Sequence, residues 1–176
     1  MTRRKESARS RRQVVLDEHV TLREMIALLR AANTKREVAE RLLEFLDLLP
    51  AADRPCGGYS RGMRRKTAIA LALIGDPEAL LLDEPTDGLD PDGARRFTEL
   101  LAELKRRGRA VVIASHILPL IEKRCDRVGI LDRGTLVAQG TLAELRLRAN
   151  EPDADLERLF LVLTGREERD ATGLLG

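Results

Sequence analysis

The sequence has few aromatic residues: it contains no tryptophan, and aromatic residues make up 2% of its 176 residues. Its core must therefore be built from leucine, valine, isoleucine and alanine. The two cysteines, Cys56 and Cys125, are far apart, without a C-x-x-C pattern or a histidine at metal-ligand spacing, which indicates reduced thiols rather than a zinc site. No apolar stretch approaches the roughly 18 to 20 residues that a membrane-spanning helix needs.

Charge is abundant but unevenly distributed. Apolar residues make up 43% of the chain and charged residues 34%, as is typical of a globular domain. The net charge is only +2, yet residues 1–12 contain six basic side chains against one acidic one. Such an arm could bind nucleic acid or anionic lipid, or be a solvated tail. We expect it to be disordered and assign it no function.

The first half of the chain has helical periodicity. Capping boxes, in which a threonine precedes a glutamate by three residues, open two amphipathic segments and predict helices at 21–31 and 34–49. Prolines and glycines at 50–58 predict a loop. Ser60 can then cap a third helix that ends before Gly75.

Beyond Pro77, short apolar runs alternate with helical patterns. These predict strands at 79–82, 110–114, 127–131 and 135–139, and helices that begin at Asp90 and occupy 141–149 and 153–164. Apolar strands separated by helices favour a mostly parallel sheet with helices on its faces. The predicted fold class is therefore α/β.

The end of one strand carries the first chemical signal. The run LLLDEP places Asp83 and Glu84 directly after three leucines, at the sheet edge where ligands bind in such folds. Asp83 could hold a Mg²⁺ bound to nucleotide phosphates, and Glu84 could orient or deprotonate a water. Alternatively, these residues simply end a strand.

Two further groups point to the same chemistry. The strand at 110–114 is followed by His116, which could converge with Glu84 on one γ-phosphate, although an isolated histidine is more often structural. Ser60 and Gly62 stand at a helix start, where free N–H groups and the helix dipole favour an anion. An ordinary capped helix would explain the serine as well.

Four motifs together resemble those of the ATP-binding cassette (ABC) ATPases, the motor subunits of ABC transporters. YSRGM at 59–63 is similar to the signature motif, LLLDEP at 80–85 to the Walker B strand, TDGLDP at 86–91 to the D-loop and ASH at 114–116 to the switch histidine. The resemblance covers about residues 13–164. Tyr59, Arg61 and Met63 depart from the usual L-S-G-G-Q. The version with Arg61 and Met63, together with the tail DLERLFLVLTG at 155–165, resembles the drug, antibiotic and lipid exporter branch.

The resemblance implies a fold. It is the C-terminal part of a P-loop NTPase (RecA-like) domain with a mostly parallel sheet, together with the helical signature subdomain. The implied organisation is a basic arm at 1–12, a Q-loop remnant and helical subdomain at 13–75, an α/β core with the other three motifs at 76–149, and a helical extension at 150–176.

The resemblance also implies a site and partners. Glu84 and His116 would be catalytic, Asp83 would hold Mg²⁺, and the residues that contact ATP would be Ser60, Gly62, Asp90 and Gln13. The implied partners are a transmembrane permease subunit and a second ATPase subunit, arranged head to tail so that each signature helix caps the partner's ATP. No nucleic acid is implied. The implied location is the cytoplasmic face of the plasma membrane, through the permease.

One expected motif is missing. The family grips ATP with G-x-x-G-x-G-K-[ST], and the nearest match, Gly57 and Gly62, overlaps the signature motif and has Met63 and Arg64 at the Lys and Ser/Thr positions. We therefore expect a truncated chain that is inactive alone and exposes apolar sheet surface. It could instead complete another subunit's ATP site without catalysis of its own, or be a non-functional gene fragment. Relatives that act on DNA or ribosomes carry long coiled coils or two cassettes, and this chain has neither.

We predict that the purified 176-residue chain does not hydrolyse ATP. Without a phosphate-gripping loop, bound Mg²⁺-ATP loses the positioning and charge neutralisation on which phosphoryl transfer depends. Phosphate release from ATP by the chain alone measures this. Turnover that disappears in Glu84→Gln would contradict the prediction.

Overall fold

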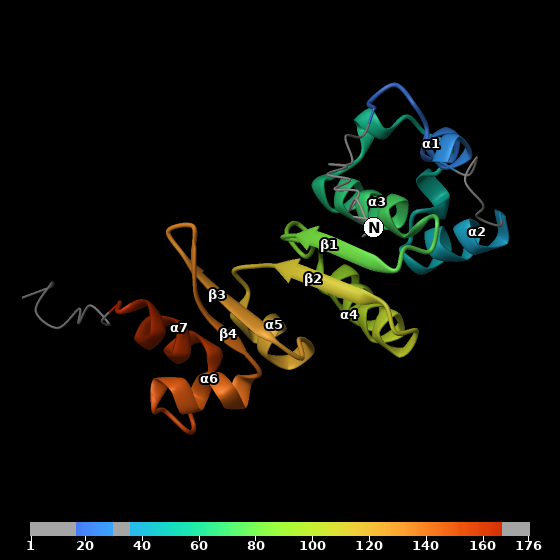
Figure 1. Cartoon of the computed structure of the whole chain (residues 1–176). Coiled ribbons are helices and arrows are strands. Elements are labelled where there is room, and N and C mark those ends of the chain that lie inside the picture. Colours follow the sequence, from blue (N-terminus) through green and yellow to red (C-terminus); the bar gives the residue numbers. More distant parts are fainter. Residues whose placement is uncertain (1–16, 30–35, 167–176) are drawn as a thin grey trace, which may run out of the picture. The chain divides into compact units, whose positions relative to one another are not determined.

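The computed structural model describes residues 17–29 and 36–166 and divides into two compact units (Figure 1). Unit 1 ends at Val112, and unit 2 begins at Ile113. The predicted basic arm and Gln13 lie outside the described residues. Within the described ranges, none of the helices has the length and apolar composition of a membrane-spanning segment.

Unit 1 begins with helices that form a small apolar core. α1 (Leu22–Leu29) and α2 (Arg36–Phe45) both contact α3 (Arg61–Leu73), and the short 3-10 turns η2 (Leu49–Ala51) and η3 (Cys56–Gly58) lie between α2 and α3 in the chain. The buried apolar side chains of these segments include Leu22, Ile26, Ala39, Leu43, Leu46 and Leu48. Leu22 and Ile26 confirm the apolar face predicted for the first helix. The face predicted for the second helix, which began at Val38, is wrong: α2 buries Ala39 and Leu43, and Val38 is 52% exposed.

The second helix ends earlier than predicted. α2 stops at Phe45 rather than at residue 49. Asp47 has left-handed backbone geometry, with φ 58°, and the amide of Leu48 donates to the carbonyl of Leu43 at 2.8 Å. This is the pattern in which a left-handed residue closes a helix C-terminus. Apolar periodicity alone does not reveal such an end.

The rest of unit 1 is an α/β element. β1 (Ala79–Asp83) pairs with β2 (Ala110–Ala114), the two arrows point the same way, and α4 (Pro91–Arg106) connects them (Figure 1). The last two residues of β2, Ile113 and Ala114, belong to unit 2. The buried face of α4 consists of Gly93, Phe97, Leu101 and Leu104. The predicted α/β class, with parallel strands joined through a helix, is confirmed.

One face of this strand pair is exposed. Alternate residues of a strand point to the same side of the sheet. Leu81 in β1 and Val112 in β2 remain 77% and 60% exposed, whereas Leu80 is buried. The expected exposure of apolar sheet surface is therefore found at these two residues.

Unit 2 is built on an antiparallel hairpin. β3 (Val128–Asp132) pairs with β4 (Thr135–Gly140), and Arg133 and Gly134, both with positive φ, form the two-residue turn between them. A right-twisted hairpin favours positive φ at both positions of such a turn. The predicted turn is confirmed, and this pair is antiparallel within a fold predicted to be mostly parallel.

Three helices complete the core of unit 2. They are α5 (Leu118–Arg124), α6 (Leu142–Ala149) and α7 (Leu156–Thr164), and the buried side chains they share with the hairpin are Ile121, Ile130, Ala138, Leu145, Leu156 and Leu159. The sequence analysis missed α5, a seven-residue helix. α7 begins three residues later than predicted because Asp155 caps it by accepting from the amide of Arg158 at 2.8 Å.

We expect Leu159→Ala to lower the free energy of unfolding of unit 2 by about 2 to 5 kcal/mol, because it removes a fully buried leucine and leaves a cavity. Leu147→Ala is the matched control: Leu147 is 82% exposed in the same unit, and its loss should change stability by about 0.5 kcal/mol or less. Urea unfolding of the two variants provides the comparison. Equal destabilisation would contradict the core described for unit 2.

Candidate functional site

The start of α3 and the end of β1 meet at one edge of unit 1. Gly75 and Asp76, with φ of 104° and 48°, reverse the chain between the helix and the strand. The guanidinium of Arg61, the first residue of α3, pairs with the carboxylate of Asp87, just beyond β1. One turn further on, Nη1 of Arg65 donates to the carbonyl of Asp83 at 3.2 Å. The predicted anion-binding helix start therefore lies beside the predicted carboxylates.

Ser60 caps α3, as predicted. Its Oγ accepts a hydrogen bond from the amide of Met63 at 3.2 Å, and Ser60 is exposed to solvent. Accepting through oxygen leaves the hydroxyl proton able to donate to another oxygen. Ser60 can therefore cap the helix and contact an anion at the same time.

Gly62 is required by its surroundings. A β-carbon at this position would lie 2.8 Å from the carbonyl oxygen of Gly88, which is closer than such contacts occur. Gly88 has φ +76°, and a β-carbon there would lie 2.9 Å from Cγ of Arg61. Two glycines therefore let the helix start and the loop after β1 approach backbone to backbone.

The loop after β1 holds Glu84 in an unusual conformation. Glu84 has φ +43°, a region that non-glycine residues rarely adopt and that costs of order 1 to 3 kcal/mol. Two turn hydrogen bonds follow it, from Asp87 to the carbonyl of Glu84 and from Leu89 to that of Thr86, both at 3.1 Å. Strained backbone of this kind concentrates at functional sites.

Asp83 and Asp90 flank this loop. Asp83 ends β1 and is exposed. Asp90 caps α4, with its Oδ1 accepting from the amide of Gly93 at 2.7 Å. The capping contact is a structural role for Asp90, and its predicted contact with ATP stays a prediction.

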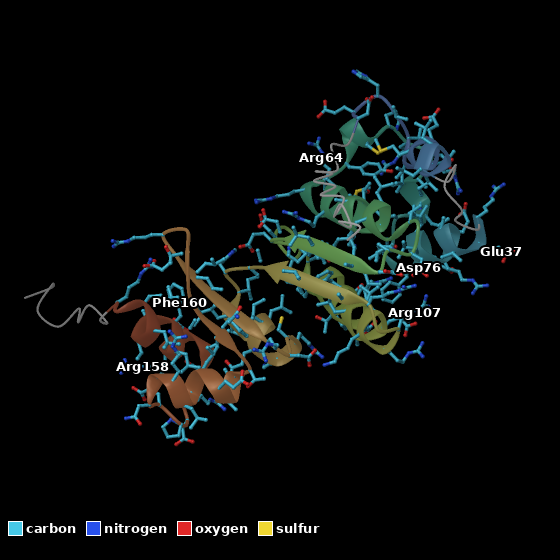
Figure 2. All side chains as sticks on the ribbon, viewed as in Figure 1. Glu37, Arg64, Asp76, Arg107, Arg158 and Phe160 are labelled. Atoms are coloured by element: carbon cyan, nitrogen blue, oxygen red, sulfur yellow. The ribbon has the colours of Figure 1, made fainter. Side chains whose placement is uncertain are left out.

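The loop before α3 is fastened to the segment ahead of α1. Amides of Cys56 and Gly57 donate to the carbonyls of Val20 and Glu18 at 3.1 and 3.0 Å. Arg64, labelled in Figure 2, donates from Nη2 to the carbonyl of Gly57 at 3.0 Å. Gly57 is thus needed for packing against Glu18, where a β-carbon would lie 2.9 Å from its carbonyl oxygen.

Tyr59, which departs from the family's usual leucine, is buried behind this loop. Its side-chain hydroxyl donates to the carbonyl of Ala51 at 2.7 Å, and the residue is 5% exposed. Burial, with Cys56 as a smaller cause, raises the pKa of Tyr59 to about 12. The tyrosine therefore anchors the loop that leads into Ser60.

The structure does not test the placement of the remaining predicted residues at this edge. Ser115 and His116 belong to unit 2, so the predicted convergence of Glu84 and His116 stays a prediction. Oγ of Ser115 accepts from the amide of Ile117 at 3.1 Å. Gln13 lies outside the described residues.

The described residues offer few protein ligands for a metal at this edge. Among residues 17–29 and 36–166, no group of three or more His, Cys, Asp or Glu side chains is placed to hold a metal. Mg²⁺ is usually bound by one or two carboxylates together with water and substrate phosphates. An exposed Asp83 fits that mode, in which the nucleotide supplies most ligands.

The sequence analysis missed the contacts that join the two segments. Arg61, Arg65, Asp87 and Gly88 were not identified as partners, although Arg61 stands where the signature motif usually has glycine. That departure was the available signal. A residue that replaces glycine at a tightly packed helix start has to be accommodated by a neighbour.

Together, the helical signature segment, the parallel strand pair and the carboxylates beyond β1 define an α/β domain of the nucleotide-binding ATPase class. A family model described as "AAA domain, putative AbiEii toxin, Type IV TA system" matches residues 4–122, which include the whole site edge. The chain belongs to this AAA domain family, and its homologues are ATP-binding proteins of ABC transporters.

Similar proteins come from bacteria and animals. An uncharacterized ABC transporter ATP-binding protein of Nostoc sp. is 46% identical over 111 residues, which are 60% of this chain and 33% of the relative. The Nod factor export ATP-binding protein I of Burkholderia orbicola is 37% identical over 130 residues, 71% of this chain and 43% of the relative. Human ATP-binding cassette sub-family A member 2 is 40% identical over 138 residues, 76% of this chain and 6% of the relative.

The solved structures agree with the fold. A structure described as the ATP binding subunit of an ABC transporter has a TM-score of 0.80 and 32% identity, covering 85% of this chain and 65% of that one. A nucleotide-free ATP-binding cassette from an ABC transporter, with a TM-score of 0.60 and 24% identity, supports the fold alone. The chain spans about a third to two-fifths of the length of the first bacterial relatives it matches.

We expect Tyr59 to ionise with a midpoint near pH 12 instead of its usual value near 10. Since the chain has one tyrosine and no tryptophan, the near-ultraviolet absorbance of tyrosinate reports this residue alone. Because the folded pKa is raised, the stabilisation linked to this phenol is complete below pH 10 and is lost as the pH rises through 12.

Two comparisons check this titration. Urea-unfolded protein should titrate near pH 10, and Tyr59→Phe should show no such signal. A folded midpoint equal to the unfolded one would mean that the loop before α3 is not anchored as described.

Proposed function

We propose that the chain is the ATP-binding subunit of an ABC transporter, or part of one, which couples ATP binding and hydrolysis to export. One observation carries the proposal: the start of α3 and the carboxylates beyond β1 share one edge, joined by Arg61 and Asp87. Transport across a membrane is supported by the names of the relatives, and export by the Nod factor export protein among them.

The charges at this edge suit a nucleotide phosphate. α3 has no acidic residue in its first turn, and Arg61, Arg64, Arg65 and Lys66 all lie in its first half. Arg61 and Arg64 are paired with the carboxylates of Asp87 and Glu18. The helix start still offers its N–H groups and the hydroxyl of Ser60 to a phosphate.

Each residue of the edge has a role in this proposal. Ser60 and the backbone at Gly62 would bind the γ-phosphate of an ATP molecule held by a partner subunit. At the chain's own ATP site, Asp83 would hold the Mg²⁺, whose charge neutralises the phosphates, and Glu84 would orient the attacking water and take its proton. His116, which follows β2, would contact the γ-phosphate of that same site.

The phosphate-gripping loop must come from another stretch of polypeptide, because these 176 residues contain no G-x-x-G-x-G-K-[ST]. This absence also favours a second candidate function, in which the chain is a non-catalytic partner that completes another subunit's site. In both cases the partners would be a second ATPase subunit and a membrane permease, on the cytoplasmic side.

A complementation experiment tests the function. The chain is combined with an ABC ATPase subunit that carries its own phosphate loop, and ATP turnover is measured. Gly62→Ala should lower the turnover that depends on the mixture by about 100-fold, because the added methyl group would displace the helix start from Gly88. Gly58→Ala is the matched control, since a β-carbon at Gly58 meets nothing within 4 Å.

Glu84→Gln separates the two candidate functions. If the chain only completes a partner's site, this variant leaves turnover in the mixture unchanged. Glu84 belongs to the chain's own ATP site, which has no phosphate loop and therefore does not turn over. When a phosphate loop is joined to the chain, Glu84→Gln should lower turnover by about 100-fold or more. If Gly62→Ala and Gly58→Ala give the same ATP turnover, both in the mixture and in the chain with a joined phosphate loop, the edge of unit 1 is not a nucleotide site.

A further inference from the structure

We infer that Arg61 and Arg65 are positioning residues that fasten the loop after β1 and thereby hold Glu84 in its left-handed conformation. Arg61 pairs with the carboxylate of Asp87, and Arg65 donates to the carbonyl of Asp83 at 3.2 Å. These two anchors flank Glu84 in the sequence, one before it and one after it. The importance of Glu84 rests on the proposed function, whereas the fastening itself does not.

Helix geometry explains why one segment reaches both anchors. Residues four positions apart lie on the same face of a helix, so Arg61 and Arg65 both face the loop from α3. Their neighbours Gly62 and Lys66 follow the same spacing along this edge. A β-carbon at Gly62 would lie 2.8 Å from the carbonyl of Gly88, and one at Gly93 would lie 3.0 Å from Cε of Lys66.

Arg61 contributes more than its charge. Its side-chain stem lies against Gly88, where a β-carbon would be 2.9 Å from Cγ, 3.0 Å from Cδ and 3.3 Å from Nε. Gly88 has φ +76° and therefore closes the loop that starts at Glu84, whose φ is +43°. Long basic side chains commonly pack their apolar stems in this way. Arg61 thus covers the second positive-φ residue of the loop and ion-pairs with the residue before it.

The fastening can be measured on the chain without nucleotide. The amide of Leu89 donates to the carbonyl of Thr86 at 3.1 Å, inside the fastened loop, so its hydrogen exchange reports opening of this loop. Arg61→Ala and Asp87→Ala should each accelerate this exchange by about fivefold, and the double variant should be no faster than either one. Arg61→Lys, which keeps the charge and most of the stem, should partly restore protection.

A matched control exists on α4. Arg106 and Glu103 form an ion pair whose side chains are 74% and 36% exposed, against 76% and 36% for Arg61 and Asp87. Arg106→Ala should leave the exchange of Leu89 unchanged. It removes an equally exposed arginine that does not contact the loop.

The backbone of Glu84 gives the second readout. Its ¹³Cα and ¹³Cβ chemical shifts depend on φ, and in Arg61→Ala and Arg65→Ala they should move toward those of an unconstrained glutamate, but not in Arg106→Ala. Unchanged Leu89 exchange in Arg61→Ala and Asp87→Ala would overturn the fastening. Faster exchange with unchanged Glu84 shifts would overturn the positioning of Glu84.

Milder variants and the complementation experiment distinguish the remaining outcomes. If an alanine variant does not fold, Arg61→Lys and Asp87→Asn supply the same comparison with smaller changes. If exchange and shifts respond as expected while the complementation experiment finds no nucleotide function, the fastening stands and the proposed function fails.

Discussion

The reversal between α3 and β1 is the constraint on which the site depends. A helix of 13 residues is about 20 Å long, and the strand that follows runs back beside it after the turn at Gly75 and Asp76. The first residues of the helix and the last residues of the strand must therefore lie at the same edge. The ion pair between Arg61 and Asp87 is direct evidence that they do. Opposite partial charges are thereby placed side by side, with helix N–H groups on one segment and carboxylates on the other.

Close backbone approach couples the two segments of this edge. The carbonyl of Gly88 lies where a side chain at residue 62 would begin, and the stem of Arg61 fills the space above Gly88. Neither segment can shift without moving the other, because packed contacts of this kind do not deform gradually. Such coupling can hold Glu84 at a φ that an isolated glutamate would leave, since strained conformations persist where their surroundings determine them.

Much of this arrangement could be predicted from the sequence, because local signals specify it. The serine before an amphipathic run predicted the α3 cap, and Asp90 before Pro91 predicted the start of α4. The left-handed end of α2 at Asp47 and the short helix α5 carry no apolar periodicity and were missed. The contact between Arg61 and Asp87 joins residues 26 positions apart, which no local pattern specifies. The family resemblance identified the motifs, but it could not supply that contact, since Arg61 is where this chain departs from the usual signature.

The two segments of the edge lie close together in the sequence, which matters for a chain without a phosphate loop. The contacts that join the start of α3 to the loop after β1, together with the caps at Ser60 and Asp90, are made between residues 60 and 93. None of these contacts involves a phosphate loop. Phosphoryl transfer depends on positioned charge rather than on covalent chemistry by the protein. In the proposed function, the helix start would therefore act on a triphosphate held elsewhere, and the part that binds the phosphates and the part that caps them would reside on separate polypeptides.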